Sequence, residues 1–208
     1  MAEIDKALSL LSLERLKALS DGVIAIVITI LVLGLDVPKA HDFSESGFLA
    51  FLARIEHQVL PYIVSFALTA GCWVLHHVML NFMSRCDRTF VWLNLLFMLP
   101  LTLTPYVTIM RAEYPGEIII AIVFGGVQLA NYLLLLAIWH YGLRHLAKLP
   151  FLPSVVRSMD TRIMMAIALN ITGVLLVPVS ERLSTAVFVF TPLVFIRHNT
   201  IDTPVSQD

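Results

Sequence analysis

Three polar residues stand immediately before a long apolar run and could do chemistry at a membrane boundary. Arg15, Ser20 and Asp21 precede the run from Gly22 to Leu35. A carboxylate this close to hydrocarbon is costly unless it is paired or has a function. Arg15 lies six residues before Asp21, which is too far on one helix for the i,i+4 contact. We therefore expect both charged groups to find partners on other helices.

A second polar group, His76 and His77, lies within another apolar stretch. Adjacent residues project about 100° apart on a helix, so the two rings cannot easily face one metal ion. No Cys or carboxylate follows at i+3 or i+4, where a zinc site would place a further ligand. Trp73 lies one turn away and is expected to pack against them. We predict hydrogen bonding, with a pH response because histidine titrates near neutrality, and no metal site.

The composition indicates the elements that must position these groups. Hydrophobic residues make up 58% of the 208 residues, charged residues 14%, and the mean hydropathy is +0.85. Such a chain is an integral membrane protein rather than a soluble domain. The net charge of -1 and the lack of a basic run argue against nucleic acid as a partner. Residues 1–20 lack the features of a cleaved signal peptide, so we expect them to remain attached.

The apolar segments are long enough to cross about 30 Å of hydrocarbon as helices. We expect an all-α, polytopic membrane protein with one domain over residues 1–208. Its six predicted spans, the last the shortest, are 20–37, 59–83, 90–110, 118–141, 163–179 and 183–196.

The distribution of Lys and Arg predicts the orientation, because cytoplasmic loops retain an excess of these residues. Ten of the 14 lie on one side of the predicted spans and four on the other. Both termini are therefore expected to be cytoplasmic. An even number of spans agrees with this count, since removing the sixth would place Arg197 outside.

The first span carries an apolar stripe on one helical face. Ile26, Ile30 and Leu33 follow at i, i+4 and i+7, and Thr29 stands beside them. The usual interpretation is a face that packs in the core or faces lipid. The polar residues at its start, Asp36 at its end and the hydroxyl between them also allow a polar path along the helix.

Three segments together resemble the prokaryotic transmembrane protein 175 family, relatives of an endolysosomal potassium channel. The segment from Arg15 to Leu35 resembles the signature first helix, with Leu19 where the family has Phe before Ser-Asp. Trp73 to His77 resembles the Trp-x-x-His-His motif of the second helix, and Asn94 to Pro100 resembles the third. The resemblance covers about the first 110 residues, and the remainder agrees in hydropathy alone.

The resemblance implies a potassium channel: a homotetramer of six-helix subunits in a prokaryotic plasma membrane, with four first helices around a central pore. On this basis Ile26 forms the narrowest apolar ring, Ile30 and Leu33 form further rings, and Thr29 supplies a hydroxyl layer that favours potassium. Apolar rings can close a pore by dewetting, and oxygen atoms replace part of an ion's water shell. Because a Thr-Val-Gly-Tyr-Gly loop is absent, we expect modest selectivity. Beyond permeating potassium, itself and the bilayer, no cofactor, metal or partner is expected.

By the same resemblance, seven residues form a polar network between the first three helices. Such groups commonly make interhelical hydrogen bonds worth about 1 kcal/mol each. We assign only this role to Arg15 and Ser20, whereas Asp21 has either this role alone or also sets the electrostatics of the cytoplasmic pore. The seven are Arg15, Ser20, Asp21, Trp73, His76, His77 and Asn94.

Two other classes of function remain as alternatives. A proton-coupled secondary transporter could use Asp21, His76 and His77, although such folds are commonly built from repeated halves with interrupted helices, which we do not find here. An enzyme would need a nucleophile or metal constellation, and Ser20 beside Asp21 makes no convincing triad. We therefore predict a channel and no enzyme, chiefly because of the family resemblance.

Overall fold

The described part of the chain is entirely helical. The computed structural model describes residues 12–37, 45–147 and 153–196. Their only extended pairing is an isolated bridge between Met83 and Ala147. The helices are α2 (Leu13–Ile30), the 3₁₀ helix η1 (Leu31–Gly34), α3 (Glu45–Asn81), α4 (Arg88–Glu113), α5 (Ile118–His145), α6 (Pro153–Leu176), α7 (Glu181–Phe190) and α8 (Leu193–Ile196).

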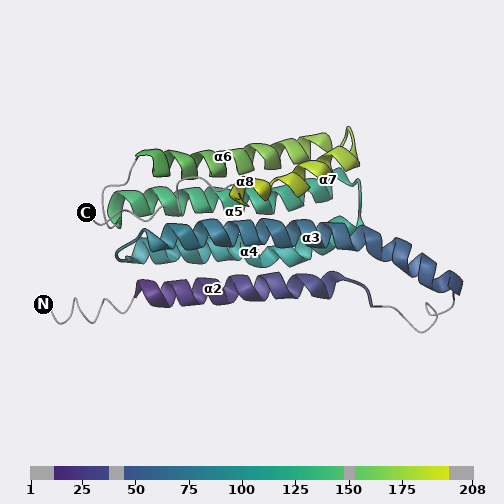
Figure 1. Cartoon of the computed structure of the whole chain (residues 1–208), viewed down its shortest axis with the longest axis horizontal. Coiled ribbons are helices and arrows are strands. Elements are labelled where there is room, and N and C mark those ends of the chain that lie inside the picture. The colour runs from purple at the N-terminus through teal and green to yellow at the C-terminus, as the bar shows by residue number, and fades with distance from the viewer. Residues whose placement is uncertain (1–11, 38–44, 148–152, 197–208) are drawn as a thin grey trace, which may run out of the picture.

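The long helices form an up-and-down bundle in which α2 lies along one side and α6 along the opposite side (Figure 1). Helix α2 packs on α3 and α4, α4 packs on α5, and α5 packs on α6. Helix α3 extends beyond the ends of its neighbours before the chain enters the bundle (Figure 1). The first helix is therefore covered by the described chain on one side only.

The first helix begins earlier and ends earlier than the predicted span 20–37. Ser12 caps its start, because its Oγ accepts a hydrogen bond from the backbone N–H of Arg15 at 3.1 Å. At the other end the chain tightens into the 3₁₀ turn η1, and Leu35 is extended. Hydropathy misses the start because polar residues of the first turns lie outside the apolar run.

In the described part of the chain, five helices are long and apolar enough to cross a membrane: α2 continued by η1, α3, α4, α5 and α6. The predicted span 183–196 is not one helix in the described residues. Helix α7 has 10 residues and is about 15 Å long, which is about half of the hydrocarbon thickness. The break follows Phe190, where Pro192 lacks the N–H that would continue the helical hydrogen bonds. The sixth apolar segment is thus built as two short helices, α7 and α8.

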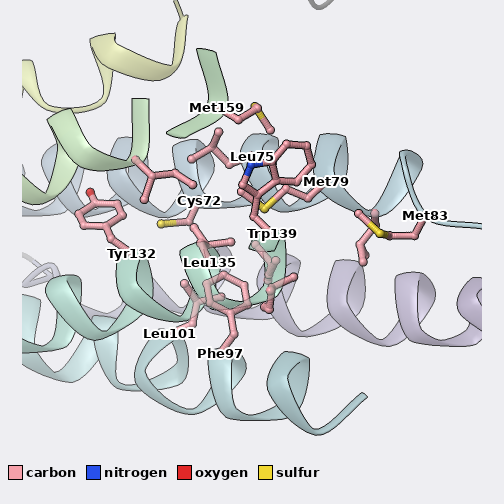
Figure 2. Close-up of a cluster of buried hydrophobic side chains, with 14 of the residues drawn as sticks. Cys72, Leu75, Met79, Met83, Phe97, Leu101, Tyr132, Leu135, Trp139 and Met159 are labelled. Carbon is pink, nitrogen blue, oxygen red and sulfur yellow. The ribbon is translucent and has the colours of Figure 1, made fainter. Parts of the chain in front are cut away.

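A continuous apolar core holds the bundle together (Figure 2). Large apolar side chains are also exposed on the outer helix faces, including Leu96, Leu99 and Leu103 on α4 and Leu175 on α6. Apolar residues both inside and outside a helix bundle are typical of a protein surrounded by lipid. We conclude that the chain is a multi-pass membrane protein. The labelled core residues come from four helices and the turn after α3: Cys72, Leu75, Met79, Met83, Phe97, Leu101, Tyr132, Leu135, Trp139 and Met159.

Helices α5 and α6 approach each other closely at one of two adjacent glycines. A Cβ atom added to Gly125 would lie 2.1 Å from Cγ2 of Val174, whereas one added to Gly126 would meet no atom within 4 Å. Gly125 therefore permits the contact, while Gly126 faces open space.

We predict that Gly125→Val destabilises the bundle by about 1–3 kcal/mol, the usual cost of overpacking a core. The measurement is the temperature at which the detergent-purified protein loses its monodisperse size-exclusion peak. Gly126→Val is the matched control, because it makes the same substitution in the same helix without the close contact. Equal loss of stability in both variants would contradict the close approach of α5 and α6.

Candidate functional site

Helix α2 has one face buried against the bundle. Leu16, Ser20, Ile24, Val27 and Leu31 are all buried, and their spacing of three or four residues places them on one side of a helix. They pack toward α3 and α4. This face fixes the rotation of α2 in the subunit.

The opposite face of α2 is apolar and exposed. Ile26 is 58% exposed and Leu33 is 77% exposed, and Ile30 and Leu19 are also exposed large apolar side chains. The three predicted constriction residues, Ile26, Ile30 and Leu33, therefore share the open side of the first helix, with Leu33 on the 3₁₀ turn η1. Their role as pore rings stays a prediction.

Thr29 lies on the same exposed face. Its Oγ1 donates to the backbone carbonyl oxygen of Ile26 at 2.9 Å. A hydroxyl has one proton and two acceptor lone pairs, so this bond uses the proton within α2. The oxygen is left as an acceptor, which is the chemistry that a permeating cation requires.

Asp21 connects α2 to α3. Its Oδ1 accepts a hydrogen bond from Nε1 of Trp73 at 2.8 Å. Sequence reasoning grouped both residues in one network but gave Trp73 only a packing role. An indole N–H among apolar neighbours is a donor that needs an acceptor, and this signal could have suggested the pair.

The other two predicted network residues of α2, Ser20 and Arg15, have no side-chain hydrogen bond to another helix among those given for the described residues. Ser20 is buried, and its Oγ donates to the carbonyl oxygen of Leu16 at 2.9 Å within α2. Arg15 is exposed, and the hydrogen bond given for it joins its backbone N–H to Ser12. The side-chain hydrogen bond that joins this end of α2 to another helix is therefore the one between Asp21 and Trp73.

His76 connects α3 to α4. Its Nε2 lies 2.7 Å from Oδ1 of Asn94, and both side chains are fully buried. Because Nδ2 of Asn94 donates to the carbonyl oxygen of Phe90 at 2.7 Å, Oδ1 is the acceptor and His76 carries its proton on Nε2. The imidazole also stacks on Phe97, with ring centroids 5.2 Å apart. This pair holds the second and third predicted spans together.

His77 points away from His76. It is exposed, and its ring lies 5.3 Å from that of Trp73. The two histidines therefore belong to different contacts, His76 with α4 and His77 with Trp73 on α3. Within the described ranges, no group of three or more His, Cys, Asp or Glu residues could hold a metal ion.

A further polar contact, which the sequence reasoning missed, holds the other end of the first span. The backbone N–H of Asp36 donates to Oε1 of Gln58 at 2.9 Å, and the Gln58 side chain is buried. Gln58 lies in the first half of α3, just before the apolar segment that begins at Val59, and its amide is the signal that could have pointed to this contact. The first span is thus tied to α3 at both ends, by Asp21–Trp73 and by Asp36–Gln58.

These contacts lie in the part of the chain that matches a known family. The family model described as "Endosomal/lysosomal potassium channel TMEM175" matches residues 15–105, which include nearly all of α2, all of α3 and most of α4. Residues 15–105 of this chain are thus similar to the TMEM175 family. The Asp21–Trp73 and His76–Asn94 contacts are therefore contacts of the TMEM175 segment.

Individual TMEM175 relatives extend the comparison beyond that segment. A potassium channel of Chamaesiphon minutus is 33% identical over 131 residues, covering 62% of this chain and 64% of the relative. A potassium channel of Streptomyces collinus is 36% identical over 129 residues, covering 60% of this chain and 62% of the relative. The chain thus spans just under two thirds of the length of the curated relatives it matches.

A solved TMEM175 structure covers nearly the whole bundle. The crystal structure of a lysosomal potassium-selective channel TMEM175 homolog from Chamaesiphon minutus matches with a TM-score of 0.77 and 27% identity. The match covers 88% of this chain and 96% of that one. The similarity in fold therefore includes helices beyond residue 105.

We predict that Trp73→Phe lowers the free energy of unfolding by about 1.5–3 kcal/mol, because it removes a hydrogen bond to a carboxylate while it keeps an aromatic ring. The measurement is thermal stability of the purified protein in detergent. Trp92→Phe is the matched control, since Trp92 is exposed on α4. In an Asp21→Ala background the effect of Trp73→Phe should largely vanish, and a full effect there would contradict the assigned contact.

Proposed function

We propose that this chain is a subunit of a potassium-permeable channel whose pore is lined by α2. The observation that carries the proposal is the one-sided burial of this helix. Its inner face packs on α3 and α4, while its outer face presents Ile26, Thr29, Ile30 and Leu33 to the surroundings of the isolated subunit. The relatives named as potassium channels support potassium as the permeant ion.

The proposed channel is a homotetramer. A single α2 helix can form only one side of a pore, so further copies must supply the other sides. We propose four copies, as the family resemblance implies. In that assembly the exposed apolar face of α2 is removed from lipid, which accounts for a hydroxyl in the middle of an otherwise apolar stripe.

The constriction would consist of stacked apolar rings. Residues four apart on a helix are separated by about 6 Å along its axis, so Ile26 and Ile30 would form two successive rings with Leu33 beyond them. A narrow apolar ring resists hydration and blocks ions without a moving part. Thr29 would place one acceptor oxygen per subunit between the Ile26 and Ile30 rings.

The proposed orientation places both termini in the cytoplasm of a prokaryote, with the protein in the plasma membrane. Arg85 and Arg88 lie at the bundle end where α2 begins, as does Arg144 at the end of α5 (Figure 1). This clustering of positive charge supports a cytoplasmic assignment for that end. The channel would need no cofactor, and its partners would be its own copies, the bilayer and potassium ions.

The geometry favours a channel over a proton-coupled transporter. A transporter that used Asp21, His76 and His77 would need them to share a proton-binding site. Instead, Asp21 accepts from Trp73, and His76 is sealed between Asn94 and Phe97. Similarly, these residues do not form the constellation of an enzyme's active site.

We predict that Ile26→Asn raises potassium flux severalfold, because an amide in the narrowest ring lets water enter. Purified protein is placed in liposomes with a potassium gradient, and a proton ionophore completes the circuit. The matched control is Ile119→Asn, the same change at an exposed position on α5. Unchanged flux in Ile26→Asn, or an equal rise in the control, would argue against a pore along α2.

We predict that Thr29→Ala lowers the permeability of potassium relative to sodium, because it removes an acceptor oxygen. The reversal potential with potassium on one side and sodium on the other measures this ratio. Thr102→Ala is the control, since the exposed Thr102 on α4 makes the same kind of bond, from Oγ1 to the carbonyl of Leu99 at 2.8 Å. A ratio that changes in neither variant would leave Thr29 with a packing role alone.

A further inference from the structure

A large groove lies at the end of the bundle opposite the start of α2. It is bounded by α3, the end of α4, α5 and α7, and its volume is about 1030 Å³. This is at the upper end of the range for small-ligand sites, about 300–1,000 Å³. No residue of α2 lines it, so the groove is separate from the proposed pore. Its walls are largely apolar, with Val59, Ile63, Phe124, Phe188 and Val189 among the lining residues.

One end of the groove carries a buried ion pair. Arg111 lies in the last turn of α4, its side chain is 7% exposed, and its Nη2 contacts Oε1 of Glu181 at the start of α7. Among the residues that the structure describes, Nη1 of Arg111 and Oε2 of Glu181 are buried without a hydrogen-bond partner. Leaving a charged group unsatisfied in a buried position is costly. Each side chain of the pair therefore keeps hydrogen-bonding capacity that no described residue uses, and both residues line the groove.

The charges around this pair balance. Arg182 and Glu56 also line the groove, so two arginines and two glutamates are among its lining residues. A ligand with a net negative charge would supply acceptors to the arginines but no donor to Oε2 of Glu181. A ligand that complements both the arginines and the glutamates must carry an anion that accepts hydrogen bonds and a cation that donates them. Both groups must lie at one end of the ligand, and the rest of it must be apolar.

We propose that the groove binds phosphatidylethanolamine. Its phosphate would accept from Arg111 and Arg182, its ammonium would donate to Glu181 and Glu56, and an acyl chain would occupy the apolar walls. Phosphatidylcholine has a phosphate but no N–H donor, because its nitrogen is fully methylated; quaternary ammonium groups are recognised by aromatic faces instead. Phosphatidylglycerol has no cation for Glu181. The end of α4 also lies at the level of the head groups if α4 spans the bilayer.

The test is native mass spectrometry of the full-length, detergent-purified protein with equal amounts of dioleoyl phosphatidylethanolamine, phosphatidylcholine or phosphatidylglycerol. We expect phosphatidylethanolamine to bind about tenfold more tightly than either other lipid, the effect of one charge-assisted hydrogen bond. Equal retention of all three lipids, or of none, would overturn the proposal. Preference for phosphatidylglycerol would replace it with a site for anionic lipids.

Two variants locate the site. Ala186→Trp fills the groove from α7 without altering the ion pair and should abolish the preference for phosphatidylethanolamine. Leu175→Trp is the matched control, because Leu175 is 68% exposed on α6 and does not line the groove. If Ala186→Trp binds like the unaltered protein, the lipid lies elsewhere. If it instead changes the oligomeric mass, the groove is an interface between copies. Either outcome rejects the proposal.

A third variant tests the head-group contacts and avoids an unpaired buried charge. Arg111→Gln combined with Glu181→Gln replaces both members of the pair with neutral amides, which match the size of the glutamate and are shorter than the arginine. We expect this double variant to keep binding lipid in the groove and to lose the discrimination between phosphatidylethanolamine and phosphatidylcholine. Undiminished discrimination would show that other groups recognise the ammonium and would overturn the assignment to Arg111 and Glu181.

Discussion

The arrangement of the first three spans depends on the polar contacts that α3 makes to α2 and to α4. Trp73 donates to Asp21 of α2, and one turn further on His76 bonds to Asn94 of α4. In hydrocarbon no water can satisfy these groups, so each must find its partner inside the protein. Apolar packing alone permits helices to slide or rotate, whereas a bond between single atoms does not. Trp73 and His76 lie one turn apart on the same side of α3, and their two bonds therefore fix the rotation of α3 relative to both α2 and α4.

The fixed rotation of α2 has a consequence for its outer face. With Ser20 and Ile24 turned toward the bundle, Ile26 and Leu33 must point away from it. The hydrogen bond from the backbone N–H of Asp36 to Gln58 holds the C-terminal end of the same span against α3. A helix that is held at both ends and left uncovered along one side is suited to present a rigid surface to identical copies. The polar contacts of the subunit thus set the geometry that the proposed pore requires.

Five of the six spans could be predicted from hydropathy, because the membrane thickness constrains the length of an apolar segment. Where other forces set the boundaries, the prediction was less accurate. The cap at Ser12 starts α2 outside the apolar run, and Pro192 divides the last segment into two short helices. The family motif grouped Asp21, Trp73, His76 and Asn94, but it could not say which atoms meet. Which atoms meet depends on the rotation of each helix about its own axis. The spacing of apolar residues cannot predict this rotation when apolar residues occur on every face of the helix.

Among the buried polar groups of the described residues that have an unsatisfied atom, His76 and Arg111 lie in different surroundings. Nδ1 of His76 has no partner among the described residues, but its ring stacks on Phe97 and its other nitrogen is bonded, so there is little room for a ligand. Nη1 of Arg111 also lacks a described partner, yet Arg111 borders a groove large enough for a lipid chain. An unsatisfied atom indicates a binding site only where space adjoins it. By this criterion His76 serves the packing of the bundle, and Arg111 serves a molecule that enters from the membrane.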